Sequence, residues 1–410
     1  MIDKHAAPHK AVVLWLSGAR LDDIRACSEV ERLLERGALV ELEPLPIAEP
    51  RTQHYQVLSG RSPASFGFFD GLVPRGYRVI EEAAGRGTTP KLFPDLLRTV
   101  GWTVGYEEEE QPSELISPLQ RWSRSAPTSP SCLIVKCPMP EGADTSRIDA
   151  ALRMAREWVG ETGMLALLSD TRPAAVERFV NVNNFLDDMG VMERDKESGE
   201  INWANSLAYY AGNGQLWVNL LGRDAQGAVH PRAEYEEVRE TLIKALPHKL
   251  RDVEAGVPVI ERIYRKEELY SGDYLFCAPD LVVVFKPGYA PSPRSVRLEF
   301  DEATFTAPTA GQITIAGTHP SMVKGFLLAS APALAVGLQA PEQAPLTAVS
   351  PTMLHALGVE YADGEVPALS ALFAPSYLET HPIRSVAQGQ ELSEEDEELI
   401  ISHLRDLGYV

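Results

Sequence analysis

Short runs of consecutive apolar residues alternate along this chain with longer segments whose apolar residues recur at helical spacing. Uninterrupted apolar runs of this length are typical of strands that are buried on both faces of a sheet. They lie at residues 11–16, 38–42, 132–136, 164–168, 281–285 and 325–330. Apolar residues three and four positions apart predict helices at residues 22–36, 146–158, 234–246 and 351–357. The alternation predicts an α/β fold with a doubly wound, mostly parallel sheet that is flanked by helices.

The pattern becomes irregular between residues 74 and 130, where glycines, prolines, a run of glutamates and Trp102 interrupt it. We interpret this stretch either as a small cap inserted into the α/β domain or as a long decorated excursion from it. The domain itself is predicted to span residues 11–375. Residues 376–410 include a cluster of acidic side chains and are predicted to form an acidic helical tail.

Composition and charge narrow the class of protein. Of the 410 residues, 44% are hydrophobic and 23% are charged, as in ordinary globular proteins. The formal net charge of -20 would repel phosphate backbones, so we expect no nucleic acid partner and interpret the acidity as favouring solubility. The four cysteines are scattered without paired spacing, which predicts reduced core cysteines rather than a disulfide framework or structural zinc.

The start of the chain and its apolar runs bear on location. Residues 1–10 are polar and lack the apolar core of a signal peptide. No apolar run approaches the length of a membrane span. We therefore expect a cytoplasmic protein that does not associate with membranes.

Several motifs follow one another in a fixed order from about residue 11 to about residue 370: VVLWLSGAR, LSGRSPASFGFFDG, LLSDT, APDLVVVF, AGTHPSMVKGFLLASAPAL and SPTMLHALGV. In this order they resemble the type I phosphodiesterase/nucleotide pyrophosphatase branch of the alkaline phosphatase superfamily. The resemblance implies an alkaline phosphatase-like fold with its site at the carboxyl edge of the sheet. It also implies phosphoryl transfer with two metal ions, usually zinc, and a Thr or Ser nucleophile.

Most residues that such a site requires are replaced in this chain. Ser17 stands where the resemblance implies the first Asp ligand, and Pro50 stands at the nucleophile position. Arg172 replaces a His, whereas Asp170 and His319 remain in place. In the family these two ligands belong to different metals, and alone they cannot hold a binuclear centre. The resemblance therefore implies a metal site that has been largely dismantled.

Neighbouring residues offer replacements for the lost groups. Thr52 lies two residues after the nucleophile position and could replace the nucleophile, or pair its hydroxyl with the imidazole of His54. The alternative is that Thr52 caps a helix and His54 fills an aromatic slot. Asp144 and one of Asp22 or Asp23 could act as displaced metal ligands, although the latter two are also suited to begin a helix.

The other candidates carry charge or protons at the ends of strands. Arg172 could neutralise Asp170 and bind a phosphate or carboxylate, or the two could form a plain ion pair. His319 could act as a general base or hydrogen-bond donor, or it could be a core histidine. Ser17 and Arg20, at the end of the first strand, complete the expected pocket.

Three functions are compatible with these residues. We prefer a repurposed, metal-independent enzyme that acts on an anionic small metabolite and needs no cofactor. Its catalytic residues would be Thr52, His54, Asp170 and His319, and its substrate-binding residues Ser17, Arg20 and Arg172.

The second function is a metal-dependent phosphodiesterase or phosphatase with shifted ligands, in which Asp170 and His319 would help to hold zinc. The third is a non-catalytic pseudo-enzyme that binds a ligand or partner. The sequence leaves the oligomeric state open, and a homodimer is one of the states compatible with it.

Overall fold

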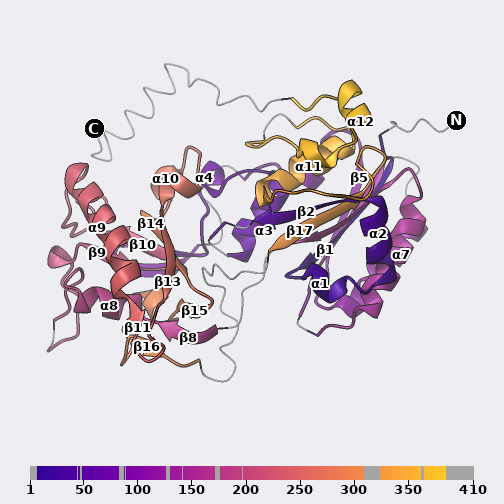
Figure 1. Ribbon diagram of the computed structural model, residues 1–410. Helices are drawn as coiled ribbons and strands as arrows, with labels where there is room; N and C mark the ends of the chain where they lie inside the picture. The colour runs from indigo at the N-terminus through magenta and orange to yellow at the C-terminus, as the bar shows by residue number, and fades with distance from the viewer. Residues whose placement is uncertain are drawn as a thin grey trace, which may run out of the picture.

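The computed structural model of the chain describes residues 7–43, 45–46, 49–82, 87, 89–125, 130–140, 142–170, 176–195, 197–308, 324–361 and 364–384. Figure 1 shows two parts side by side: a large sheet flanked by helices, and a second part that contains α8, α9 and smaller sheets. The predicted α/β class is confirmed.

The main sheet has the strand order β18-β2-β17-β7-β1-β6-β5, and β19 pairs with β2. Its strands are β1 (Lys10–Ser17), β2 (Ala38–Glu43), β5 (Thr103–Glu108), β6 (Ser131–Pro138), β7 (Met164–Ser169), β17 (Gly325–Ser330), β18 (Leu338–Gln339) and β19 (Ala344–Pro345). Within it, β17 runs antiparallel to β2 and β7, and the other pairings are parallel. The sheet is therefore mostly parallel, as predicted.

Helices cover both faces of this sheet because its strands are apolar on both sides. In β1, Ala11, Val13 and Trp15 enter one core, while Val12 and its alternate neighbours enter the other. The first core is covered by α3 (Pro50–Ser59), α5 (Phe93–Thr99), α11 (Val349–Ala356) and α12 (Pro375–Thr380). The second is covered by α1 (Leu21–Ile24), α2 (Ser28–Arg36), α6 (Ile116–Ser125) and α7 (Ser146–Val159). This is the doubly wound arrangement that buried strands require.

One predicted helix is divided in the structure. The spacing of apolar residues predicts a single helix over residues 22–36, but α1 and α2 are separated by a turn. Cys27 has extended backbone angles, φ -70° and ψ 127°, and serves as the N-cap residue of α2. Apolar spacing continued across this break, so the pattern alone did not reveal it.

The second part is formed by the chain between β7 and β17. An antiparallel sheet has the order β13-β14-β10-β9, and a smaller sheet has the order β15-β8-β16. The strands of the second part are β8 (Val176–Val180), β9 (Ala208–Tyr210), β10 (Gln215–Val218), β11 (Arg251–Asp252), β12 (Val257–Pro258), β13 (Ile260–Arg265), β14 (Leu281–Phe285), β15 (Gly288–Pro291) and β16 (Phe305–Thr306). Of these, β11 and β12 pair only with each other. Its α-helices are α8 (Val182–Asp188), α9 (Ala233–Lys249) and α10 (Lys266–Leu269). The strand predicted at residues 281–285 thus belongs to this part and not to the main sheet.

The stretch from 74 to 130 is divided between the two parts. The hairpin of β3 (Leu72–Arg75) and β4 (Arg78–Glu81) packs Leu72 and Val79 against the core of the second part. Further along, α5, β5 and α6 belong to the main sheet and its helical layers. The short helix α4 (Pro63–Phe66) precedes the hairpin.

Short 3-10 helices complete the described structure: Pro112–Glu114, Trp203–Asn205, Leu275–Cys277, Ser295–Arg297, Leu346–Ala348 and Ser370–Leu372. The predicted acidic tail lies largely outside the described residues, which end at 384.

Candidate active site at the carboxyl edge of the main sheet

A row of side chains crosses the main sheet near the carboxyl ends of β5, β6 and β1. The parallel register pairs Glu108 with Lys136 and Lys136 with Trp15. Paired residues on adjacent strands point to the same face of a sheet. Trp15 enters the core that α3 covers, so all three side chains face the helix that carries His54.

Lys136 is the centre of this cluster, and our sequence interpretation missed it. Its Nζ lies 3.2 Å from His54 Nδ1, 3.7 Å from Glu108 Oε1 and 4.7 Å from the centroid of the Trp15 ring. Its side chain is 21% exposed. The available signal was a lone basic residue in the otherwise apolar run CLIVK, because burying an ammonium group requires compensating partners.

His54 is held as a neutral imidazole. Its ring stacks on Trp15, with 5.4 Å between centroids and 16° between planes, and it meets Tyr106 edge-on at 6.0 Å. Burial, and then the charge of Lys136, lower the pKa of His54 to about 4. An ammonium group can only donate, so Nδ1 accepts from Lys136 and Nε2 carries the hydrogen.

Asp170 follows β7 and lies against the end of β1. It accepts hydrogen bonds from the Ser17 hydroxyl at 3.1 Å and from the Gly18 N–H at 3.0 Å. Gly18 has a φ of 77°, in the left-handed region that glycine enters without strain, and this turn brings its N–H to Asp170. Burial raises the pKa of Asp170, while the charge of Lys136 opposes that shift. The Trp15 indole N–H forms no well-aligned hydrogen bond, although it lies near enough to Asp170 to favour its charged form.

Thr52 lies in the first turn of α3 and is 1% exposed. Its N–H donates to Glu49 Oε2 at 2.6 Å, and its hydroxyl lies 3.0 Å from the Phe69 carbonyl oxygen and 3.1 Å from Glu49 Oε2. Each residue of an α-helix is rotated by about 100° from the one before it, so two side chains that are two positions apart point to nearly opposite sides of the helix. The Thr52 hydroxyl thus has local partners, and its helical neighbour His54 pairs with Lys136 instead.

Three of the other sequence candidates, Arg20, Asp22 and Asp23, make no recorded contact with Lys136. Arg20 is exposed and lines an open cavity of about 570 Å³ together with Arg25 and Lys324. Asp22 and Asp23 lie in the first turn of α1 and are exposed.

Three further residues complete the survey of sequence candidates. The carboxylate of Asp144 accepts the N–H of Ser146 at 2.9 Å. Arg172 and His319 lie outside the described residues.

The described side chains do not provide a metal-binding set. Among them, no group of three or more His, Cys, Asp or Glu side chains lies together in a way that could hold a metal ion. Asp170 accepts a hydrogen bond from Ser17, and the positive charge of Lys136 acts on its carboxylate without an ion pair being formed between the two described side chains. Cys137, buried at the end of β6, is a poor nucleophile because burial raises its pKa to about 11.

No family model matches the chain, and no curated protein matches it in sequence. No helix in the described ranges is both long and apolar enough to cross a membrane.

Solved structures share the fold. Human ectonucleotide pyrophosphatase/phosphodiesterase 5 matches with a TM-score of 0.51 and 13% identity, covering 92% of this chain and 100% of the other. An alkaline phosphatase PafA mutant matches with a TM-score of 0.52 and 11% identity, covering 90% and 99% of the two chains. Phosphonoacetate hydrolase from Sinorhizobium meliloti, in complex with phosphonoformate, matches with a TM-score of 0.52 and 10% identity, covering 87% and 97%. The resemblance drawn from the motifs is thereby confirmed at the level of the fold.

Proposed function

We propose that this chain, which has the alkaline phosphatase-like fold, is a metal-independent enzyme that acts on an anionic small metabolite. The observation that carries the proposal is the position of Lys136. Its ammonium group lies 3.2 Å from His54, and its charge acts on the buried Asp170. A lysine at the carboxyl edge of the sheet supplies positive charge where the resemblance implies metal ions.

Substrate binding would use the Lys136 ammonium group. A partly buried charge is screened less by water than one at the surface, so it attracts a phosphate or carboxylate more strongly. Glu108, 3.7 Å from Lys136, has a side chain that is 59% exposed. Because the Glu108 carboxylate can move into solvent, a substrate anion can replace it as the counter-ion of Lys136.

Proton transfer would use Ser17 and Asp170. Because burial raises the pKa of Asp170, its carboxylate is a better proton acceptor than an exposed one. As the Ser17 hydroxyl takes a proton from the substrate, it would give its own proton to Asp170, and the reverse transfer would return one to the product. His54 contributes a neutral ring whose remaining donor is the Nε2–H, suited to a developing negative charge on a substrate oxygen.

The test uses the full-length protein in excess chelator. The protein is incubated with mixtures of phosphorylated and carboxylated small metabolites, and depletion is followed by mass spectrometry. We expect at least one anionic compound to be consumed, and Lys136→Met to reduce kcat/KM by on the order of 100-fold. The matched control is Lys244→Met, which removes a lysine that is 73% exposed and pairs with Glu240 on α9. This control should retain the wild-type rate.

Two outcomes would favour the other functions. Turnover that disappears in chelator and returns with zinc would contradict the proposal and favour a metal-dependent phosphodiesterase or phosphatase. The described residues contain no cluster that could hold a metal ion. Such a centre would therefore need ligands from outside the described residues. A non-catalytic ligand-binding protein would be favoured by two results together. No compound would be turned over, and the Lys136→Met variant would retain the biological activity of the protein.

A further inference from the structure

The carboxylate of Glu108 contacts a tyrosine hydroxyl and a lysine. Its Oε1 accepts a hydrogen bond from the Tyr106 hydroxyl at 2.8 Å and lies 3.7 Å from Lys136 Nζ. Tyr106 and Glu108 are two positions apart on β5, so both side chains point to the face on which Lys136 lies. Burial raises the pKa of Glu108, but the Tyr106 hydrogen bond and the Lys136 charge outweigh burial and lower this pKa overall. The carboxylate is therefore negatively charged at neutral pH.

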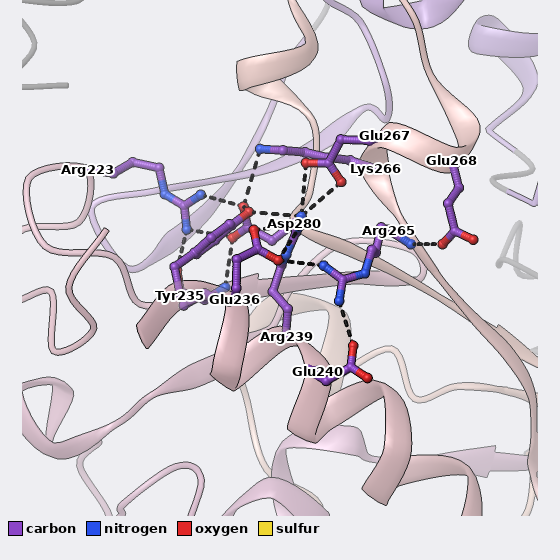
Figure 2. Close-up of polar contacts among 11 residues, drawn as sticks. Arg223, Tyr235, Glu236, Arg239, Glu240, Arg265, Lys266, Glu267, Glu268 and Asp280 are labelled. Atoms are coloured by element: carbon purple, nitrogen blue, oxygen red, sulfur yellow. Dashed lines mark hydrogen bonds and ion pairs between the residues drawn. The ribbon is translucent and has the colours of Figure 1, made fainter. Parts of the chain in front are cut away.

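The second part of the molecule contains the same three groups in a closed setting. Asp280 Oδ1 accepts a hydrogen bond from the Tyr235 hydroxyl at 2.8 Å and lies 3.5 Å from Lys266 Nζ. Figure 2 shows Arg223 and Lys266 converging on this carboxylate. Its Oδ2 lies 2.9 Å from Arg223 Nη2 and accepts the Val218 N–H at 2.8 Å. The Asp280 side chain is 0% exposed, so an external anion cannot take its place beside Lys266.

Glu108 differs from Asp280 in its access to water. The Glu108 side chain is 59% exposed and the Lys136 side chain is 21% exposed. The Glu108 carboxylate can therefore turn into solvent and be hydrated there, which leaves Lys136 open to another anion. Lys136 thus has a counter-ion that belongs to the chain and can be displaced, whereas the counter-ion of Lys266 is enclosed.

We infer that Glu108 is an internal competitor for the anion site at Lys136, and that Tyr106 is the positioning residue that keeps it there. An anion that binds Lys136 must displace the Glu108 carboxylate, so the chain lowers its own affinity for anions. The Tyr106 hydroxyl restricts Glu108 to orientations that face Lys136. Without this hydroxyl the exposed side chain would populate more rotamers and compete less. The inference rests on the proposed function, because it takes Lys136 as the group that binds the anion.

Equilibrium binding of inorganic phosphate and of malonate tests this inference. Each anion is titrated into the full-length protein at neutral pH and constant ionic strength, and the ring signals of His54 are followed by NMR, since His54 Nδ1 lies 3.2 Å from Lys136 Nζ. We expect binding in the millimolar range that Lys136→Met abolishes. Glu108→Gln should tighten the binding of both anions by about threefold, a modest factor because water screens an exposed carboxylate. Comparison of the two anions shows whether the site prefers a phosphate or a carboxylate.

Glu107→Gln is the matched control. It removes the same charge at the adjacent position of β5, but Glu107 Oε2 lies 3.3 Å from Arg121 Nη2 on α6, on the opposite face of the sheet. This variant should keep the wild-type affinity for both anions. An equal gain in Glu107→Gln and Glu108→Gln would show that only the net charge matters, and it would overturn the inference.

Tyr106→Phe tests the positioning role. It keeps the ring that meets His54 edge-on and removes the hydroxyl. It should tighten anion binding by about twofold in the wild-type background and have no further effect in Glu108→Gln, because the hydroxyl acts through Glu108. A merely structural role would change the affinity alike in both backgrounds. Such equal changes, or weaker binding in Tyr106→Phe alone, would overturn the positioning role.

The outcomes separate this inference from the proposed function. Binding that needs Lys136 but is unchanged in Glu108→Gln would overturn the inference and leave the proposed function standing. Tighter binding in Glu108→Gln, with no metabolite turned over, would support the inference and contradict the proposed enzyme. If neither anion binds to the wild type or to Glu108→Gln, Lys136 is not an anion site and both proposals fail.

Discussion

His54 shows how the surroundings of one residue determine its chemistry. Burial between aromatic rings and the neighbouring Lys136 both disfavour the imidazolium form, which lowers the pKa from 6.5 to about 4. The unfolded chain therefore binds a proton at this residue more readily than the folded chain between these two values. Stability contributed by neutral His54 is present above pH 6.5 and is lost as the pH falls towards 4.

This predicts a specific pH dependence of stability. Between pH 6.5 and 4, we expect His54 to account for a loss of up to about 3 kcal/mol in the free energy of unfolding. Urea unfolding across this range measures it as the difference between wild type and His54→Asn. His230→Asn, at an exposed position, is the control and should follow the wild-type curve. Parallel curves for wild type and His54→Asn would contradict the assignment.

Helix α3 shows how an element can reassign a residue that its sequence suggests for catalysis. Thr52 and His54 are two positions apart, which on an extended chain would leave them on the same side. On α3 they point in different directions, one to Phe69 and Glu49 and the other to Lys136. The helical geometry therefore separates a hydroxyl and an imidazole that the sequence alone allowed to pair.

Thr52→Val tests whether this hydroxyl is structural. We expect it to destabilise the protein by about 1–2 kcal/mol, because the buried Phe69 carbonyl and Glu49 carboxylate lose a hydrogen-bond donor. Thr99→Val, at an exposed position where the hydroxyl bonds the Leu96 carbonyl, should cost less than about 0.5 kcal/mol. Chemical denaturation measures both. A loss of turnover in Thr52→Val with unchanged stability would instead assign the hydroxyl to catalysis.

At the scale of the whole molecule, the chain combines two parts with different chemistry. The main sheet gathers Lys136, His54 and Asp170 at its carboxyl edge, whereas the second part encloses Asp280 with Arg223 and Lys266. The net charge of -20 acts on both. Such an excess of one sign destabilises a compact state by self-repulsion, and salt screens it.

The whole-molecule charge predicts a response to salt. Raising sodium chloride from about 0.01 M to about 0.15 M shortens the Debye length from about 30 Å to about 8 Å and should raise the thermal midpoint by several degrees. Potassium chloride is the control and should have the same effect, because the screening is not specific to one ion. A midpoint that falls with either salt would show that attractive ion pairs outweigh the net repulsion.

The sequence by itself determined the α/β class, the strands β1, β2, β6, β7 and β17 of the main sheet and the helices α7 and α11, because hydrophobic periodicity is a local consequence of which faces are buried. It also placed Ser17 and Asp170 at strand ends that meet. Only the tertiary structure decided that Lys136 contacts His54 and that its charge acts on Asp170, since this depends on the register between β5, β6 and β1 and on the packing of α3. The contacts of Glu108 with Lys136 and of Asp280 with Arg223 likewise join segments far apart in the chain, and no local pattern records such a meeting.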